Sequence, residues 1–81
     1  MSRTQEIASQ LLNILAEWDG PANETVLHHQ LNARVQPDAL FSEFQDAIKF
    51  CEESRWITGV RNSLRGTRWA ITDKGRAARH Q

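Results

Sequence analysis

Apolar residues recur every three to four positions along the first part of the chain. Ile7, Leu11, Ile14, Leu15 and Trp18 follow this spacing until Asp-Gly-Pro at 19–21 interrupts it. That period places the five side chains on the inward face of an α-helix, and the Gly-Pro pair is typical of a helix end. The pattern predicts a first helix over residues 3–18.

Two further helical segments follow. Residues 22–25 predict a turn or a very short strand, with Asn23 or Thr25 as the cap of a short helix over 26–34. Proline and aspartate at 37 and 38 suit a first helical turn, so the next helix is predicted over 37–54. Its inward stripe is Leu40 or Phe41, then Phe44, Ala47, Ile48 and Cys51. Its outward face then contains Ser42, Glu43, Asp46, Lys49 and Glu53.

The period changes to strict alternation after residue 55. Two β-rich runs flank a glycine-containing loop at 62–66, which predicts a β-hairpin over 56–72 with Trp69 and Ile71 turned inward. Thr72 is positioned to cap a last short helix over 73–79. The fold class expected is therefore α+β, mainly α, with a three-helix bundle followed by a hairpin and a short helix.

Length and composition are those of one small globular domain covering residues 1–81. The chain is 40% hydrophobic and 25% charged, which is too apolar for a disordered protein. It contains neither an apolar run of membrane-spanning length nor a secretory signal pattern at its start. We therefore expect a cytoplasmic protein without a membrane partner.

Charge is divided unequally along the chain, although its formal net charge is zero. Residues 1–54 contain three basic and nine acidic side chains, and residues 55–81 contain seven basic side chains and one acidic. The two parts thus have net charges of −6 and +6. A basic region of this kind attracts polyanions even when the whole molecule is neutral.

The order of elements resembles the winged helix-turn-helix domain over residues 3–79. The segment "AIKFCEESRWI" is similar to the end of that family's third helix and its first wing strand, and "WAITDKGRAA" is similar to the second wing strand and the Thr-x-x-Gly start of a last helix. The resemblance implies binding of double-stranded DNA, with the third helix in the major groove and the hairpin, or wing, on the backbone or in the minor groove. A small transcriptional regulator or accessory factor is the function expected.

The resemblance also implies which residues contact DNA. On the wing and the last helix they are Arg61, Arg65, Arg68, Lys74 and Arg76, and on the third helix they are Ser42 and Lys49. The third helix matches a DNA reader poorly, because carboxylates on its outward face are repelled by phosphates. The wing is therefore expected to make more of the contact than the helix.

Two alternatives to DNA binding follow from the same charges. The wing arginines can form salt bridges with the acidic helices and only keep the hairpin soluble. The acidic face of the third helix can instead bind a protein partner, or a second copy in a homodimer. A continuous basic stripe would favour DNA, and an acid-lined third helix beside an apolar patch would favour a protein.

The sequence contains no pattern typical of an enzyme. Gly-rich phosphate loops, His-Glu-x-x-His and Gly-x-Ser-x-Gly are absent from it, so no enzymatic activity, cofactor, metal or small-molecule substrate is expected. Adjacent His28 and His29 point about 100° apart on a helix, so we expect surface or boundary histidines rather than metal ligands. Cys51 lies on the apolar stripe and is expected to be a buried core residue.

Overall fold

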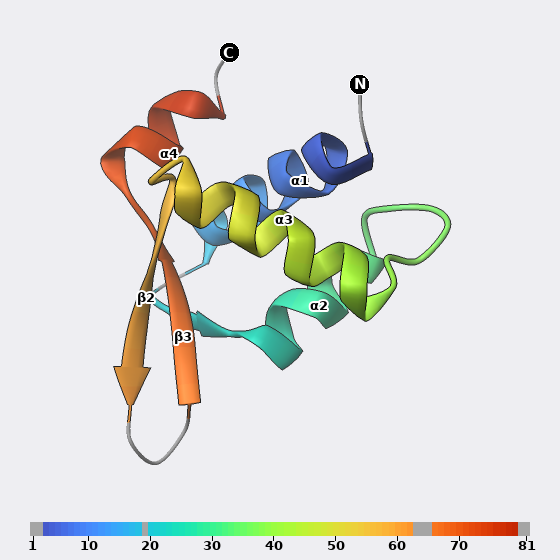
Figure 1. The fold of residues 1–81 in the computed structure, drawn as a ribbon, viewed down its shortest axis with the longest axis horizontal. Coiled ribbons are helices and arrows are strands. Elements are labelled where there is room, and N and C mark those ends of the chain that lie inside the picture. Colours follow the sequence, from blue (N-terminus) through green and yellow to red (C-terminus); the bar gives the residue numbers. More distant parts are fainter. Residues whose placement is uncertain (1–2, 19, 63–65, 80–81) are drawn as a thin grey trace.

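The computed structural model describes residues 3–18, 20–62 and 66–79, which form a mostly helical α+β structure (Figure 1). Its elements in chain order are α1 (Arg3–Glu17), β1 (Ala22–Asn23), α2 (Glu24–Asn32), α3 (Phe41–Glu53), β2 (Ile57–Asn62), β3 (Gly66–Ile71) and α4 (Asp73–Ala78). The order of three helices, a hairpin and a short last helix agrees with the prediction. The short strand β1 occupies the segment for which a turn or strand was expected.

The hydrophobic core lies where α1, α2 and α3 meet. Ile7 and Leu11 of α1, Leu27 of α2, and Phe44 and Cys51 of α3 are all fully buried in it. Each helix thus turns the central part of its predicted apolar stripe inward, as the periodicity required. Trp69 of β3 is also buried in this cluster, so the sheet and the helices share one core among the described residues.

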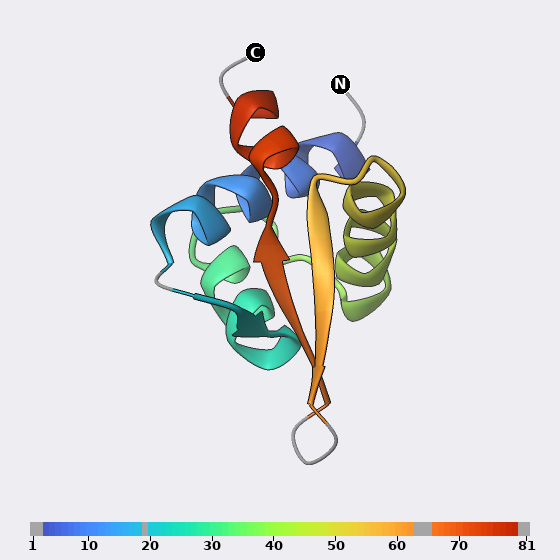
Figure 2. The same ribbon diagram turned by 90° about the vertical axis from the view of Figure 1, so that its left-hand side faces the viewer.

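The three strands form an antiparallel sheet in the order β1-β3-β2. β2 and β3 pair along their whole length, from Ile57 opposite Ile71 to Asn62 opposite Gly66. β1 pairs with β3 only at Trp69 and Arg68. Figure 2 shows the sheet covering one side of the helices, with the β2–β3 hairpin extending past them at its far end.

The second helix begins two residues earlier than predicted, at Glu24 rather than residue 26. The Asn23 side chain accepts a hydrogen bond of 2.8 Å from the Val26 amide, which satisfies one of the free amides of the first turn. Of the two caps considered, Asn23 is therefore the one used. The helix ends at Asn32, two residues before the predicted end.

The third helix begins at Phe41, so its predicted start at Pro37 is wrong. Two side chains of α2 bond to the backbone of Ala39, which would have to be helical if the helix started at Pro37. Asn32 accepts a hydrogen bond of 2.9 Å from the Ala39 amide, and the His28 ring lies 2.7 Å from the Ala39 carbonyl oxygen. The helix starts immediately afterwards, where Glu43 accepts a hydrogen bond of 2.9 Å from the Leu40 amide.

A tight junction joins the end of α3, the base of the hairpin and α4. Thr72 caps α4 by accepting a hydrogen bond of 3.0 Å from the Gly75 amide, and its hydroxyl lies 2.7 Å from the Arg55 carbonyl oxygen. The Thr72 amide donates a bond of 2.9 Å to the Trp56 carbonyl. The Thr-x-x-Gly segment therefore holds the start of α4 next to the turn that connects α3 to β2.

Trp18 was expected in the core, but its side chain is 37% exposed. It follows the last residue of α1, beyond Leu15, the last buried residue of that helix. Within the described part of the chain, the helices are too short and too polar to cross a membrane.

Candidate nucleic-acid interface

Arg61 and Arg68, here called the hairpin arginines, lie toward the far end of the hairpin and on opposite faces of it. Arg61 pairs with Thr67 and Arg68 pairs with Val60, and residues directly opposite in an antiparallel pair share a face. Successive residues alternate faces, so Arg61 lies on the face of Trp69 and Arg68 on the other. The hairpin thus presents a guanidinium group on each of its two surfaces.

The hairpin arginines form no ion pair with any residue that the structure describes. Arginines of the acidic part of the chain behave differently, because Arg3 lies 3.4 Å from a Glu43 carboxylate oxygen and Arg34 lies 2.9 Å from Glu17. The salt bridges proposed between the wing and the acidic helices are therefore absent from the described residues. Arg65, the third arginine predicted at this site, lies outside them.

Lys74 and Arg76 do not extend the hairpin patch as the sequence suggested. Both are exposed on α4, which lies at the base of the hairpin (Figure 1). The six residues of β2 separate the base from the far end, a distance of about 20 Å at the rise of a β-strand. Exposed Arg61 and half-buried Arg68 therefore form one group and Lys74 and Arg76 another, rather than a continuous basic stripe.

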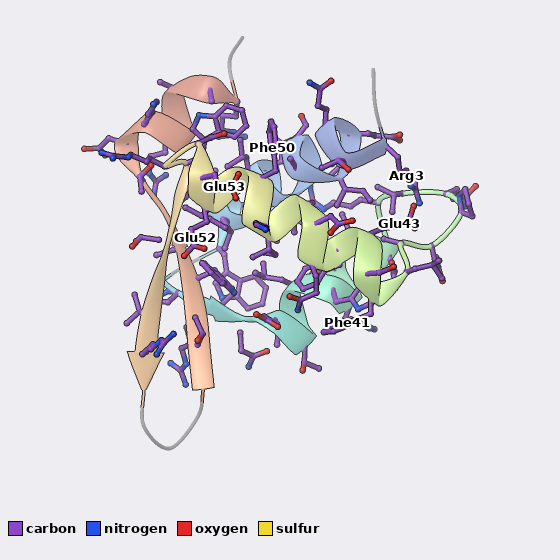
Figure 3. All side chains as sticks on the ribbon, viewed as in Figure 1. Arg3, Phe41, Glu43, Phe50, Glu52 and Glu53 are labelled. Atoms are coloured by element: carbon purple, nitrogen blue, oxygen red, sulfur yellow. The ribbon has the colours of Figure 1, made fainter. Side chains whose placement is uncertain are left out.

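The outward face of α3 is acidic, as predicted, but its composition differs in detail. Ser42, Asp46, Lys49 and Glu53 are exposed on it. Glu43 was expected there too, but it is half-buried because it pairs with Arg3 and caps the helix. Glu52 was not expected, and Figure 3 shows it at the end of α3 beside the strands. Ser42 and Lys49 thus lie among carboxylates on α3. The hairpin arginines lie on other elements, β2 and β3.

An apolar surface lies at the start of α3, where the sequence predicted a buried residue. Leu40 and Phe41 are 67% and 58% exposed, although Phe41 lies three residues before the buried Phe44 on the same helix. Phe41 packs one side of its ring near His28, at 5.9 Å between ring centroids. We call the exposed pair of Leu40 and Phe41 the α3 patch.

An open hollow of about 490 Å³ adjoins the α3 patch. It is lined by Glu24, Thr25, His28, His29, Asn32 and Phe41. It lies between α2 and the start of α3, so a side chain inserted there would contact the Phe41 ring. His28 is fixed beneath it by stacking on Phe44, with 4.9 Å between ring centroids and 18° between ring planes.

Glu24 connects the hairpin to both α2 and α3. One carboxylate oxygen accepts a hydrogen bond of 3.3 Å from the Trp69 indole nitrogen, and the other accepts a bond of 3.0 Å from the Gln45 amide. Sequence reasoning missed this contact. The available signal was an acidic residue in the first turn of a helix, which by itself indicates only a favourable interaction with the helix dipole.

The remaining candidate residues have structural roles. Cys51 is buried in the core, and burial raises the pKa of its thiol to about 12. A thiol so far from ionisation is a poor nucleophile. His28 is half-buried and bonded as described, while His29 is exposed. The described residues contain no group of three side chains able to bind a metal ion.

Comparison of the chain with models of protein families, with curated proteins and with solved structures found no match.

Proposed function

We propose that this chain is a winged-helix domain that binds double-stranded DNA through its hairpin, while α3 stays outside the major groove and binds protein. The observation that supports DNA binding most is the absence of carboxylate partners around the hairpin arginines among the described residues. The order of elements and the Thr72 cap of α4 support the winged-helix assignment.

The position of the two arginines suits contact with a duplex. A hairpin that extends past the helices and carries a cation on each face can approach phosphates on both of its sides. Such contacts are independent of base sequence and release counterions from the DNA. With Arg65 between them in the chain, the hairpin has three arginines available for this purpose.

The outward face of α3 supports the second part of the proposal. Asp46 and Glu53 are exposed there with only Lys49 between them, and a phosphate-lined groove would repel both carboxylates. Leu40 and Phe41 add exposed apolar surface at the start of the same helix. An acidic face next to an apolar patch is suited to a protein partner rather than to DNA.

Fluorescence anisotropy with a labelled duplex of mixed sequence tests DNA binding. Three neutralised phosphates give a plot of log affinity against log salt with a slope of about −2.7, and Arg68→Ala should reduce the slope to about −1.8. Arg61→Ala should have a similar effect. The loss should be similar for unrelated duplex sequences, because phosphate contacts do not read bases.

Lys74→Ala is the matched control, since it removes one exposed positive charge at the other end of the hairpin. It should leave the slope nearly unchanged. Equal losses in Lys74→Ala and Arg68→Ala would contradict binding through the hairpin. Undetectable binding of the unmodified protein at about 50 mM salt would contradict DNA binding itself.

A further inference from the structure

We propose that a hollow between α1, α4 and the end of α3 binds a small aromatic carboxylate. We call it the α1–α4 hollow. It includes Trp56, the residue before β2, so it lies at the base of the hairpin and contains neither of the hairpin arginines. The inference goes beyond the proposed function and does not depend on DNA binding.

The size of the α1–α4 hollow limits what it can hold. Its volume is about 240 Å³. Pockets for drug-sized ligands usually measure about 300–1,000 Å³, so this one suits a molecule with a single ring rather than a nucleotide or a peptide segment.

The wall of the hollow is apolar and rich in aromatic surface. It is formed by Leu12, Phe50, Trp56 and Ala78. Figure 3 shows Phe50 pointing from α3 into the space between α1 and α4. The Phe50 and Trp56 rings pack edge to face, with 5.5 Å between centroids and 74° between planes. Aromatic rings prefer offset-stacked or edge-to-face contacts, so this wall can accept a further ring.

Arg79 is the charged residue among the described residues that line the hollow, where Gln5 and Ser9 are the other polar ones. Its Nε atom donates a hydrogen bond of 3.3 Å to the Asn13 side-chain oxygen, which orients the guanidinium group. Arg79 forms no ion pair in the described part of the chain. A guanidinium group binds a carboxylate through two parallel hydrogen bonds, so the hollow is complementary to an anion of that shape.

The two features together select the ligand. A neutral aromatic molecule would cover the rings but leave Arg79 without a counter-charge. An inorganic anion would pair with Arg79 but leave the Phe50 and Trp56 rings uncovered. A carboxylate attached to one ring satisfies both parts of the site.

An NMR titration of ¹⁵N-labelled protein with benzoate and with phenylacetate tests the proposal. Each should bind with a dissociation constant of about 1–10 mM, as expected for nine or ten non-hydrogen atoms, and shift the Trp56 indole signal. Benzamide has the same ring without the charge, and acetate has the charge without the ring. Each of these should bind about tenfold more weakly, because it loses either the charged hydrogen bonds or the apolar contact.

Variants locate the binding in the hollow. Arg79→Gln should weaken benzoate binding about tenfold. Arg76→Gln removes the same charge from an exposed position of α4 that does not line the hollow, and should leave binding unchanged. Ser9→Leu places a larger side chain in the hollow from an exposed position of α1 and should abolish binding, whereas Ser9→Ala should retain it. Circular dichroism should show the same helix content in all four variants.

Two kinds of result would overturn the inference. One is an unshifted Trp56 indole signal with both carboxylates up to about 20 mM, above the weakest dissociation constant expected. The other is benzoate binding that is no tighter than that of benzamide or acetate, or that persists in Ser9→Leu. Duplex binding with the expected salt slope, measured on the same protein, would show that the proposed function stands in either case.

Discussion

Arg55 ends α3 in a backbone conformation that favours glycine. Its φ angle is 63°, in the left-handed region, and the surrounding bonds are those of a Schellman motif. The Trp56 amide donates to the Cys51 carbonyl at 2.9 Å, and the Arg55 amide donates to the Glu52 carbonyl at 3.0 Å. A residue with a Cβ atom is strained here, although the motif itself is complete.

Replacing Arg55 with glycine should therefore stabilise the protein. Relief of the left-handed strain is expected to raise the free energy of unfolding by about 1 kcal/mol, because the penalty for an L-residue in this region is about 1–2 kcal/mol. In a domain of this size that corresponds to an increase of roughly 4–8 °C in Tm. Thermal unfolding followed by circular dichroism measures it.

Arg55→Ala is the control, because it removes the same charge and keeps the Cβ atom. Its Tm should stay at or below that of the unmodified protein. An increase of equal size in both variants would assign the effect to loss of the charge instead.

At the scale of elements, α4 depends on close approach between two backbones. A Cβ atom built on Gly75 would lie 2.2 Å from the Trp56 carbonyl oxygen and 2.9 Å from a side-chain carbon of Ile71. The carbonyl oxygen cannot retreat, because it accepts the Thr72 amide at 2.9 Å. The last helix fits against the base of the hairpin only while residue 75 is glycine.

Gly75→Ala should accordingly destabilise the fold by about 3 kcal/mol, the upper range for overpacking at a buried site. Urea denaturation gives this value directly. The exposed neighbour Arg76 supplies a control, since Arg76→Ala should change stability by less than about 0.5 kcal/mol. Unchanged stability in Gly75→Ala would mean that α4 does not pack closely on Trp56.

The elements that sequence predicted well are those whose signals are local. The inward stripe of α3 from Phe44 to Cys51 follows from periodicity alone, and so do the two strands of the hairpin. The start of α3 could not be predicted in this way. It depends on Asn32 and His28, which bond to Ala39 from another helix, and no local pattern contains that contact.

The sequence predicted which residues of the candidate site are basic, but it did not predict how the fold arranges them. A count along the chain locates the basic residues in its last third. Pairing of the strands is needed to show that Arg61 and Arg68 lie on opposite faces, and the base of the hairpin separates Lys74 from both. Leu40 or Phe41 was expected to begin the inward stripe of α3, and only the structure shows that the core does not extend to them.

At the scale of the whole molecule, the division of charge favours one orientation on DNA. Residues 1–54 have a net charge of −6 and residues 55–81 have a net charge of +6, so phosphates repel the first part and attract the second. The hairpin should therefore face the duplex while the acidic outward face of α3 is turned away from it.

The Asp46→Lys variant should therefore bind DNA at least as tightly as the unmodified protein at about 50 mM salt, because it replaces a carboxylate that phosphates repel with a cation. Fluorescence anisotropy with the same duplex measures this affinity. Weaker binding by Asp46→Lys would contradict an α3 that stays outside the groove.

The Glu24 carboxylate has a mechanical consequence for both kinds of partner. Through Trp69 and Gln45 it braces the hairpin and α3 against the start of α2, so tilting either one would break a hydrogen bond. The hairpin and α3 are therefore held in one relative orientation before any partner binds. A partner that fits this orientation binds without the free-energy cost of ordering the two elements first.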